Sequence, residues 1–252
     1  MITTYHRPKT LDEALALLTQ PNRVPLGGGT SLSHSKSGSV EVVDLQSLSL
    51  DSLKRSGNNF EIGAAVTLQQ LLESEHSPEA MKSSLRLEAP LNIRNAATVA
   101  GTLVSCDGRS TLGTVLLALD TKLEQMKLDD SKIETQVSNI GEFLPLRNLQ
   151  GSLITSITIP LNVKLAFEYV SRTPADKPIV CAALAQWNSG RTRLALGGYG
   201  TTPLLAMDGT EAEGVEAAAR NVFHEATDEW ASAEYRMDVA ATLVKRCLES
   251  LT

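Results

Sequence analysis

The stretch VPLGGGTSL, Val24–Leu32, places three consecutive glycines directly after a short apolar run. Each glycine loses more backbone freedom on folding than any other residue, by about 0.5–1 kcal/mol relative to alanine inside a regular element. A triplet therefore indicates that the backbone must turn sharply or come close to something else. Two interpretations compete: a flexible turn after a strand, or a loop whose N–H groups converge on a negative charge.

The composition is that of a soluble globular chain. Of its 252 residues, 42% are hydrophobic and 21% are charged, which is close to the globular average. The net charge of −6, without a basic tract, argues against nucleic acid as a partner. The N-terminus lacks the apolar stretch of a signal peptide, and no uncharged run approaches the roughly 18 residues of a membrane span. We expect a cytoplasmic protein that does not span a membrane.

The cysteines and histidines predict no metal site in this chain. The cysteines are odd in number, widely spaced and without a C-x-x-C pair, so neither a disulfide framework nor an iron–sulfur or zinc site can be read from them. The four histidines show no i, i+4 pairing. No Ser-His-Asp or paired-carboxylate arrangement is evident either, so the sequence assigns no catalytic residue.

The glycine triplet is expected to lie between two strands, in a region of alternating helices and strands. A capping box at Thr10 and Glu13 begins a helix over about 10–20, and strands are expected at 22–26 and 40–45. Further elements expected before residue 160 are a strand at 60–63, helices at 67–72 and 110–119, short strands between 121 and 160, and a turn helix near 139–143.

A second region is poor in side-chain bulk. In IRNAATVAGT, Ile93–Thr102, alanine, threonine and glycine dominate. Either the backbone is again exposed to a ligand, or these residues form a tightly packed corner.

The chain after Pro160 predicts a separate α+β domain. Three successive strands are expected at 164–172, 179–188 and 192–200, the last two joined by a turn at Asn188-Ser189-Gly190. Helices are expected at 211–223 and 232–251.

Several blocks, in order along the chain, resemble the FAD-binding subunit of the molybdenum hydroxylases, the family of xanthine dehydrogenase and carbon monoxide dehydrogenase. The N-terminal pattern from Tyr5 to Leu15 resembles the family's Y-x-x-P-x-x-L-x-E-A-L, and Gly28–Leu32 resembles its GGT-x-L loop. The remaining blocks are IRNAATVAGT (93–102), LITSITIP (153–160), YVSRTPAD (169–176), LALGG (194–198) and ASAEYR (231–236).

This resemblance implies an α+β fold with a two-lobed FAD-binding domain of the molybdopterin dehydrogenase type. That domain would occupy residues 1–160, with lobes at about 1–53 and 54–160. A C-terminal domain over 161–252 would hold a three-stranded antiparallel sheet and helices. The implied function is that of an oxidoreductase subunit whose FAD passes electrons from partner iron–sulfur centres to an external acceptor.

The resemblance also implies which residues bind FAD. The diphosphate of FAD carries two adjacent charges, which backbone N–H groups can neutralise where glycines let the chain come close. By position, Ile154 and Tyr169 would line the flavin ring, although both also fit ordinary strand positions. The full set of expected cofactor-binding residues is Pro25, Leu26, Gly27, Gly28, Gly29, Thr30, Ser31, Leu32, Thr98, Val99, Ala100, Gly101, Thr102, Thr111, Ile154 and Tyr169.

Three positions depart from the family pattern. Ala100 stands where a second glycine is usual, Thr102 where asparagine is usual, and Thr111 where an aspartate is common. These departures put tight FAD retention in question. They leave a non-catalytic scaffold that has lost FAD as one alternative function. A stand-alone NAD(P)H-dependent flavoprotein is a second alternative.

The implied partners are an iron–sulfur subunit and a molybdopterin subunit of a heteromeric complex. The substrate would then bind on another chain, so neither it nor the subunit stoichiometry follows from this sequence. NAD, oxygen and quinone are all candidate acceptors, because the chain shows no separate G-x-G-x-x-G fingerprint.

Overall fold

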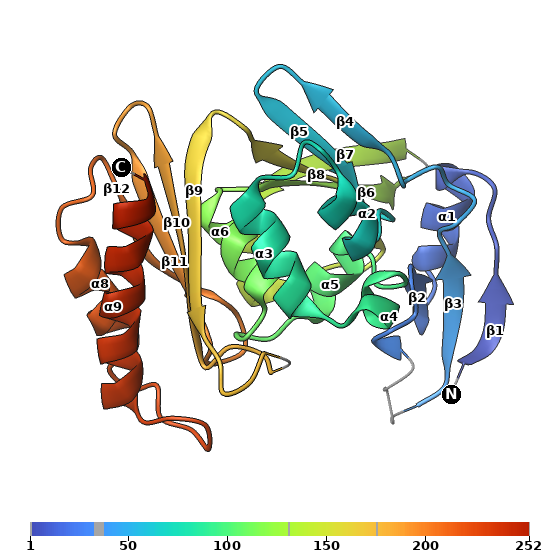
Figure 1. Ribbon diagram of the computed structural model, residues 1–252. Coiled ribbons are helices and arrows are strands. Elements are labelled where there is room, and N and C mark those ends of the chain that lie inside the picture. The colour runs from blue at the N-terminus through green and yellow to red at the C-terminus, as the bar shows by residue number, and fades with distance from the viewer. Residues whose placement is uncertain (1, 33–37, 131, 175, 252) are drawn as a thin grey trace. The chain divides into compact units, whose positions relative to one another are not determined.

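The computed structural model describes residues 2–32, 38–130, 132–174 and 176–251. The chain divides into two compact units, whose elements are labelled in Figure 1. The first unit consists of Met1–Leu71, Leu91–Ser105 and Lys122–Thr158, and the second of Leu72–Pro90, Cys106–Thr121 and Ile159–Thr252. The second unit therefore combines the C-terminal part of the chain with two segments from its middle.

The first unit begins with a parallel sheet around the glycine triplet. The strands lie in the order β1 (Ile2–His6), β3 (Val40–Asp44) and β2 (Arg23–Leu26), so the two strands predicted on either side of the triplet are confirmed. Helix α1 (Leu11–Leu18) starts as predicted, because the Thr10 hydroxyl accepts from the backbone N–H of Glu13 at 3.2 Å. Its buried side chains pack with residues of β3 and of β8 (Ser152–Pro160).

The rest of the first unit is built on a five-stranded sheet. Its strand order is β4 (Leu53–Ser56), β5 (Asn59–Gly63), β8 (Ser152–Pro160), β6 (Lys122–Asp129) and β7 (Lys132–Asn139). The helices along this part of the chain are α2 (Leu68–Glu73), α4 (Leu91–Arg94), α5 (Val99–Ser105) and α7 (Ile140–Leu146). The end of β2 and the start of α5 supply the two stretches of bare backbone.

The second unit is a four-stranded antiparallel sheet packed against helices. Its order is β12 (Leu204–Gly209), β11 (Thr192–Gly197), β10 (Val180–Trp187) and β9 (Val163–Val170). Alternate residues of β10, such as Ala182 and Leu184, pack in one core with α8 (Val215–Val222) and α9 (Ala233–Leu251). Cys181 points the other way, and its Sγ lies 3.7 Å from the Thr114 hydroxyl of α6 (Thr111–Ala118).

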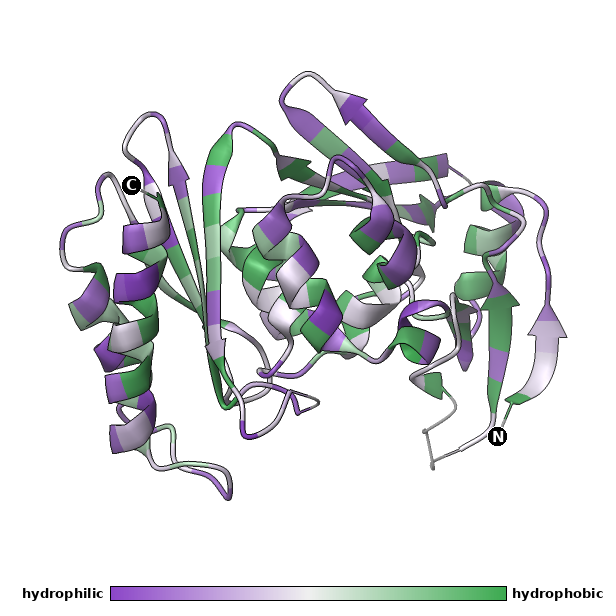
Figure 2. Ribbon diagram, viewed as in Figure 1, coloured by the Kyte–Doolittle hydropathy of each residue, from purple (hydrophilic) through white to green (hydrophobic). Residues whose placement is uncertain are grey.

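Helix α3 (Glu79–Glu88) contacts both α6 and β9. In Figure 2, α9 carries hydrophilic and hydrophobic residues in turn, as a helix with one buried face does.

The predicted three-stranded C-terminal sheet is wrong by one strand. The fourth strand, β12, pairs antiparallel with β11, and its residues are only partly buried or exposed. An edge strand of this kind lacks a clean alternation of apolar and polar residues. It also follows Pro203 and a glycine-rich connection, so the local pattern favoured a loop.

Candidate functional site

The first unit contains a cavity of about 930 Å³, a volume typical of ligand-binding pockets. Both stretches of bare backbone contribute to its wall. The expected cofactor-binding residues that line it are Pro25, Gly27, Gly28, Gly29, Thr30, Ser31, Leu32, Thr98, Ala100, Gly101 and Ile154. Residues far apart in the sequence are thus brought to one site.

The glycine triplet is explained by close packing as well as by exposure. A Cβ atom added to Gly28 would lie 1.6 Å from the carbonyl oxygen of Ala96, and one added to Gly27 would lie 2.7 Å from the Thr98 hydroxyl oxygen. Gly29 has φ = +71°, which favours glycine for a different reason. The first loop can therefore lie directly against the second segment only because it has no side chains at these positions.

Hydroxyl groups hold the two segments together. The Ser31 hydroxyl donates to the Ser105 hydroxyl at 2.9 Å, and Ser105 in turn donates to the carbonyl of Gly101 at 2.8 Å. The Thr98 hydroxyl accepts from the Gly101 N–H at 3.2 Å, in the first turn of α5. These bonds fix the backbone of the cavity wall.

The wall fits the diphosphate of FAD. Within the described ranges, the backbone N–H groups of Gly27 and Gly28 have no hydrogen-bond partner, although both residues line the cavity. A Cβ atom would fill the space between the segments. Amides without partners in a wall without side chains are what an anionic group needs in order to approach the main chain.

Two of the cations that line the cavity are held in ion pairs. Arg23 Nε donates to Glu41 at 2.7 Å, and Lys127 Nζ lies 3.0 Å from Glu134 and 3.4 Å from Asp129. Hydrogen bonds from His6 and then Arg23 lower the pKa of Glu41, while Glu134 and then Asp129 raise the pKa of Lys127. Both shifts favour the charged form of the group concerned, Glu41 in one pair and Lys127 in the other.

Several lining residues were not found by sequence reasoning. Arg147 is the most informative of them, because its backbone lies in the left-handed region, where a non-glycine residue is uncommon. No motif marks the others, which come from the end of α1 and the chain after it (18–24), from Leu45, Ala64, Val104 and Ser105, from 127–129 on β6, and from 149–151 and Leu153.

Five expected residues are not part of the cavity lining: Leu26, Val99, Thr102, Thr111 and Tyr169. Val99 is fully buried, and the Thr102 hydroxyl donates to the carbonyl of Thr98 at 2.9 Å. Tyr169 belongs to β9 in the second unit, is 39% exposed and stacks on Phe167. Direct contact of these residues with FAD stays a prediction.

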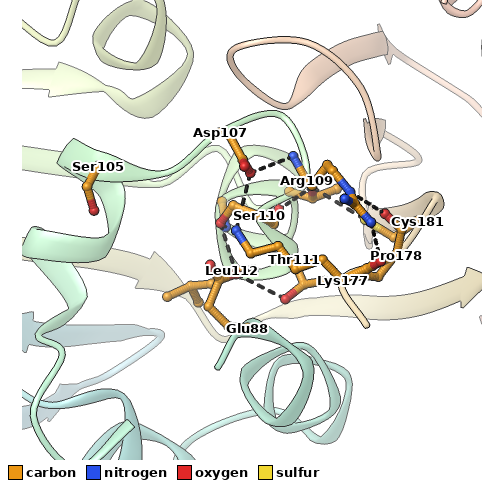
Figure 3. A network of polar contacts seen from close by, with 12 residues as sticks. Glu88, Ser105, Asp107, Arg109, Ser110, Thr111, Leu112, Lys177, Pro178 and Cys181 are labelled. Carbon is orange, nitrogen blue, oxygen red and sulfur yellow. Dashed lines mark hydrogen bonds and ion pairs between the residues drawn. The ribbon is translucent and has the colours of Figure 1, made fainter. Parts of the chain in front are cut away.

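Thr111 belongs to a buried network in the second unit (Figure 3). Its hydroxyl lies 2.7 Å from the carbonyl oxygen of Ser84 and 3.0 Å from Glu88 Oε2. The same carboxylate oxygen accepts from the Ser110 hydroxyl and the Leu112 N–H, both at 2.9 Å. Thr111 can bond a cofactor only if these internal bonds are exchanged.

This network predicts that a carboxylate is unfavourable at position 111. The substitution Thr111→Asp brings a second carboxylate next to Glu88, which is only 9% exposed. We expect it to lower the free energy of unfolding by about 2–4 kcal/mol, because two adjacent buried carboxylates cannot both ionise cheaply. Urea unfolding at pH 7 measures the change. The double variant Thr111→Asp/Glu88→Gln should recover part of it, and additive effects of the two substitutions would contradict this explanation.

The described part of the chain contains neither a membrane-spanning helix nor a cluster of metal-ligating side chains. None of its helices is both long and apolar enough to cross a lipid bilayer. No group of three or more His, Cys, Asp or Glu side chains in these ranges is arranged to hold a metal ion. The three cysteines are buried and form no disulfide bond, and burial raises the pKa of the Cys181 thiol to about 12.

Comparison with known proteins places this geometry in a family. The chain is similar to the carbon monoxide dehydrogenase medium chain of Afipia carboxidovorans, with 26% identity over 97% of this chain and 95% of that protein. It is also similar to the glyceraldehyde dehydrogenase medium chain of Sulfolobus acidocaldarius, with 28% identity over 81% of this chain and 78% of that protein.

The fold agrees with that of solved structures. A Cu,Mo-CO dehydrogenase chain superposes with a TM-score of 0.85 and 24% identity, covering 100% of this chain and 98% of the other. Quinoline 2-oxidoreductase from Pseudomonas putida 86 gives a TM-score of 0.81 at 19% identity, covering 98% and 96%. Residues 1–162 match the model of the FAD binding domain in molybdopterin dehydrogenase. Because this match spans more than half of the chain, the protein belongs to that family of FAD-binding oxidoreductase subunits.

Proposed function

We propose that this chain carries FAD as the electron-transfer subunit of a molybdenum hydroxylase-like oxidoreductase. The observation that carries the proposal is the cavity of the first unit, whose wall includes bare backbone from two distant stretches. When bound, FAD would accept electrons from iron–sulfur centres of a partner and pass them to an external acceptor. The chain itself supplies binding and orientation.

Each part of the wall has a distinct role in this proposal. The N–H groups of Gly27 and Gly28 donate to the diphosphate, and the Thr30 hydroxyl provides an additional donor. The Ser31 hydroxyl, which donates to Ser105, can join them only by exchanging that bond. Ile154 on β8, only 2% exposed, contributes an apolar surface to the same cavity. Such a mixture of apolar lining and a few convergent polar groups is typical of cofactor sites.

The departures from the family pattern weigh little against FAD binding. Thr102 and Thr111 do not belong to the cavity lining, and their hydroxyls are engaged by protein groups. Ala100 does line the cavity, but its methyl group is small and only 9% of the residue is exposed. The family pattern can therefore change at these positions without filling the site.

The proposal also covers the partners, the electron acceptor, the domain bounds and the location of the chain. Relatives named as a medium chain, or as a subunit of a dehydrogenase complex, support a heteromeric assembly. The partners would be an iron–sulfur subunit and a molybdopterin subunit, and the acceptor would be NAD, oxygen or a quinone. A FAD-binding domain at 1–160, a C-terminal domain at 161–252 and a cytoplasmic location complete the proposal.

Flavin content tests the proposal directly. The full chain, purified alone and with its native partners, should bind roughly one FAD, in the cavity of the first unit. Absorption in the flavin bands, measured before and after adding FAD, gives this stoichiometry. Well-folded protein that stays colourless with excess FAD would contradict the proposal.

A further inference from the structure

Arg147 lies in the cavity wall and connects two helix ends of the first unit. It follows α7 as its C-cap, and its Nε donates to the carbonyl of Leu144 at 3.0 Å. Its Nη1 donates to the carbonyl of Val104 at 3.3 Å, near the end of α5. The guanidinium group is thus oriented by the ends of two helices, of which α5 also lines the cavity.

The backbone at this position favours glycine rather than arginine. Arg147 has φ = 43° and ψ = 38°, the left-handed conformation in which helices commonly end with glycine. A side chain in this conformation costs free energy, so a residue other than glycine has to compensate through contacts of its side chain. The bonds to Leu144 and Val104 are two such contacts.

Arg147 reaches the place where the two backbone stretches are joined. Its partner Val104 precedes Ser105, whose hydroxyl accepts from Ser31 of the glycine loop at 2.9 Å. Val104, Ser105, Ser31 and Arg147 all line the cavity. The guanidinium group and the glycine loop are therefore both hydrogen-bonded to the C-terminal end of α5.

The bonds to Leu144 and Val104 orient the guanidinium group through carbonyl oxygens of two helix ends. A guanidinium group has five N–H donors in a planar fork that matches the geometry of phosphate oxygens.

We propose that Arg147 binds the diphosphate of FAD through its guanidinium group, opposite the amides of the glycine loop. This inference rests on the proposed function, since it assumes that FAD occupies the cavity. The amides of Gly27 and Gly28 contribute partial charges, and Arg147 adds a full positive charge.

A matched pair of substitutions tests the charge. Arg147→Lys and Arg147→Gln both remove the guanidinium fork, but only lysine keeps the charge. We expect Arg147→Gln to raise the Kd for FAD about 10- to 100-fold, and Arg147→Lys to stay within about 10-fold of the wild type. Titration of the full-length apoprotein with FAD, followed by flavin fluorescence, gives the Kd values.

Arg55→Gln is the control for the change in net charge. Arg55 lies on β4, is exposed and is not part of the cavity lining, so this variant should bind FAD like the wild type. Thermal unfolding of each apoprotein verifies that the variants are folded.

The outcomes separate the inference from the proposed function. Equal FAD affinity in Arg147→Gln and wild type would overturn the inference, as would equal losses in the lysine and glutamine variants, which indicate a purely structural role. Failure of the folded wild type to bind FAD would overturn the proposed function and the inference with it. Rescue by lysine, with Arg55→Gln unchanged, supports the role of the charge.

Discussion

Replacing Gly28 with alanine is expected to remove FAD binding from the first unit almost completely. The added Cβ atom would lie 1.6 Å from the carbonyl oxygen of Ala96, a backbone atom that no rotamer change can move away. The glycine loop and the second segment must then separate, at a cost of about 1–3 kcal/mol for overpacking. Since both segments form the cavity wall, we expect the Kd for FAD to rise about 100-fold or more.

Fluorescence titration of the apoprotein with FAD measures this loss. Gly57→Asn is the matched control, because Gly57 lies in the turn between β4 and β5, where a Cβ atom would meet nothing within 4 Å. Its φ of +58° is one that asparagine tolerates, so this variant should keep its FAD affinity. Wild-type affinity in a folded Gly28→Ala variant would mean that the two segments need not touch for FAD to bind.

The sequence predicted the part of the site that depends on the backbone. A segment that must lie close to another chain segment or to a ligand requires small residues, and this requirement is visible locally at Gly27–Gly29 and at Ala100–Gly101. The helix start at Thr10 and the strands around the triplet were likewise predictable, because caps and β-branched runs are local signals.

The contacts that complete the site depend on distant residues and leave no local signal. Arg147 bonds to Val104, 43 positions away, and nothing around Arg147 in the sequence indicates this pairing. Glu88 likewise explains Thr111 only once α3 and α6 are packed together. The positive φ of Arg147 was equally hidden, since arginine is not a residue that signals a left-handed conformation.

Arg236 is expected to contribute more to the stability of the second unit than any exposed ion pair of the chain. Its side chain is fully buried, and its guanidinium group donates to Asp228 at 2.7 Å and to the carbonyl oxygens of Ala226 and Ala231. It also lies 5.2 Å from the ring centre of Tyr199. One residue of α9 thereby holds the loop before this helix and the connection after β11.

Removing this group takes the guanidinium donors away from the Asp228 carboxylate and from the carbonyl oxygens of Ala226 and Ala231. We expect Arg236→Ala to lower the free energy of unfolding by about 3–5 kcal/mol, and the thermal midpoint by roughly 6–20 °C. Calorimetry or circular dichroism of the full chain measures the shift. Arg246→Ala is the control, because Arg246 is an exposed residue of the same helix, and it should change stability by less than about 0.5 kcal/mol.

The stability of the wild type and of the Arg236→Ala variant should also differ in its sensitivity to acid. Desolvation alone would raise the pKa of Asp228, but the bonds from Arg236 and from the N–H groups of Trp230 and Ala231 outweigh it, so this pKa is lowered. A carboxyl whose pKa is lower in the folded state stabilises the fold above its unfolded pKa, and this stabilisation is lost as the pH falls through the folded pKa. Arg236→Ala should therefore lose less stability than the wild type on acidification. Parallel pH profiles of stability for the two proteins would mean that the ion pair contributes nothing beyond packing.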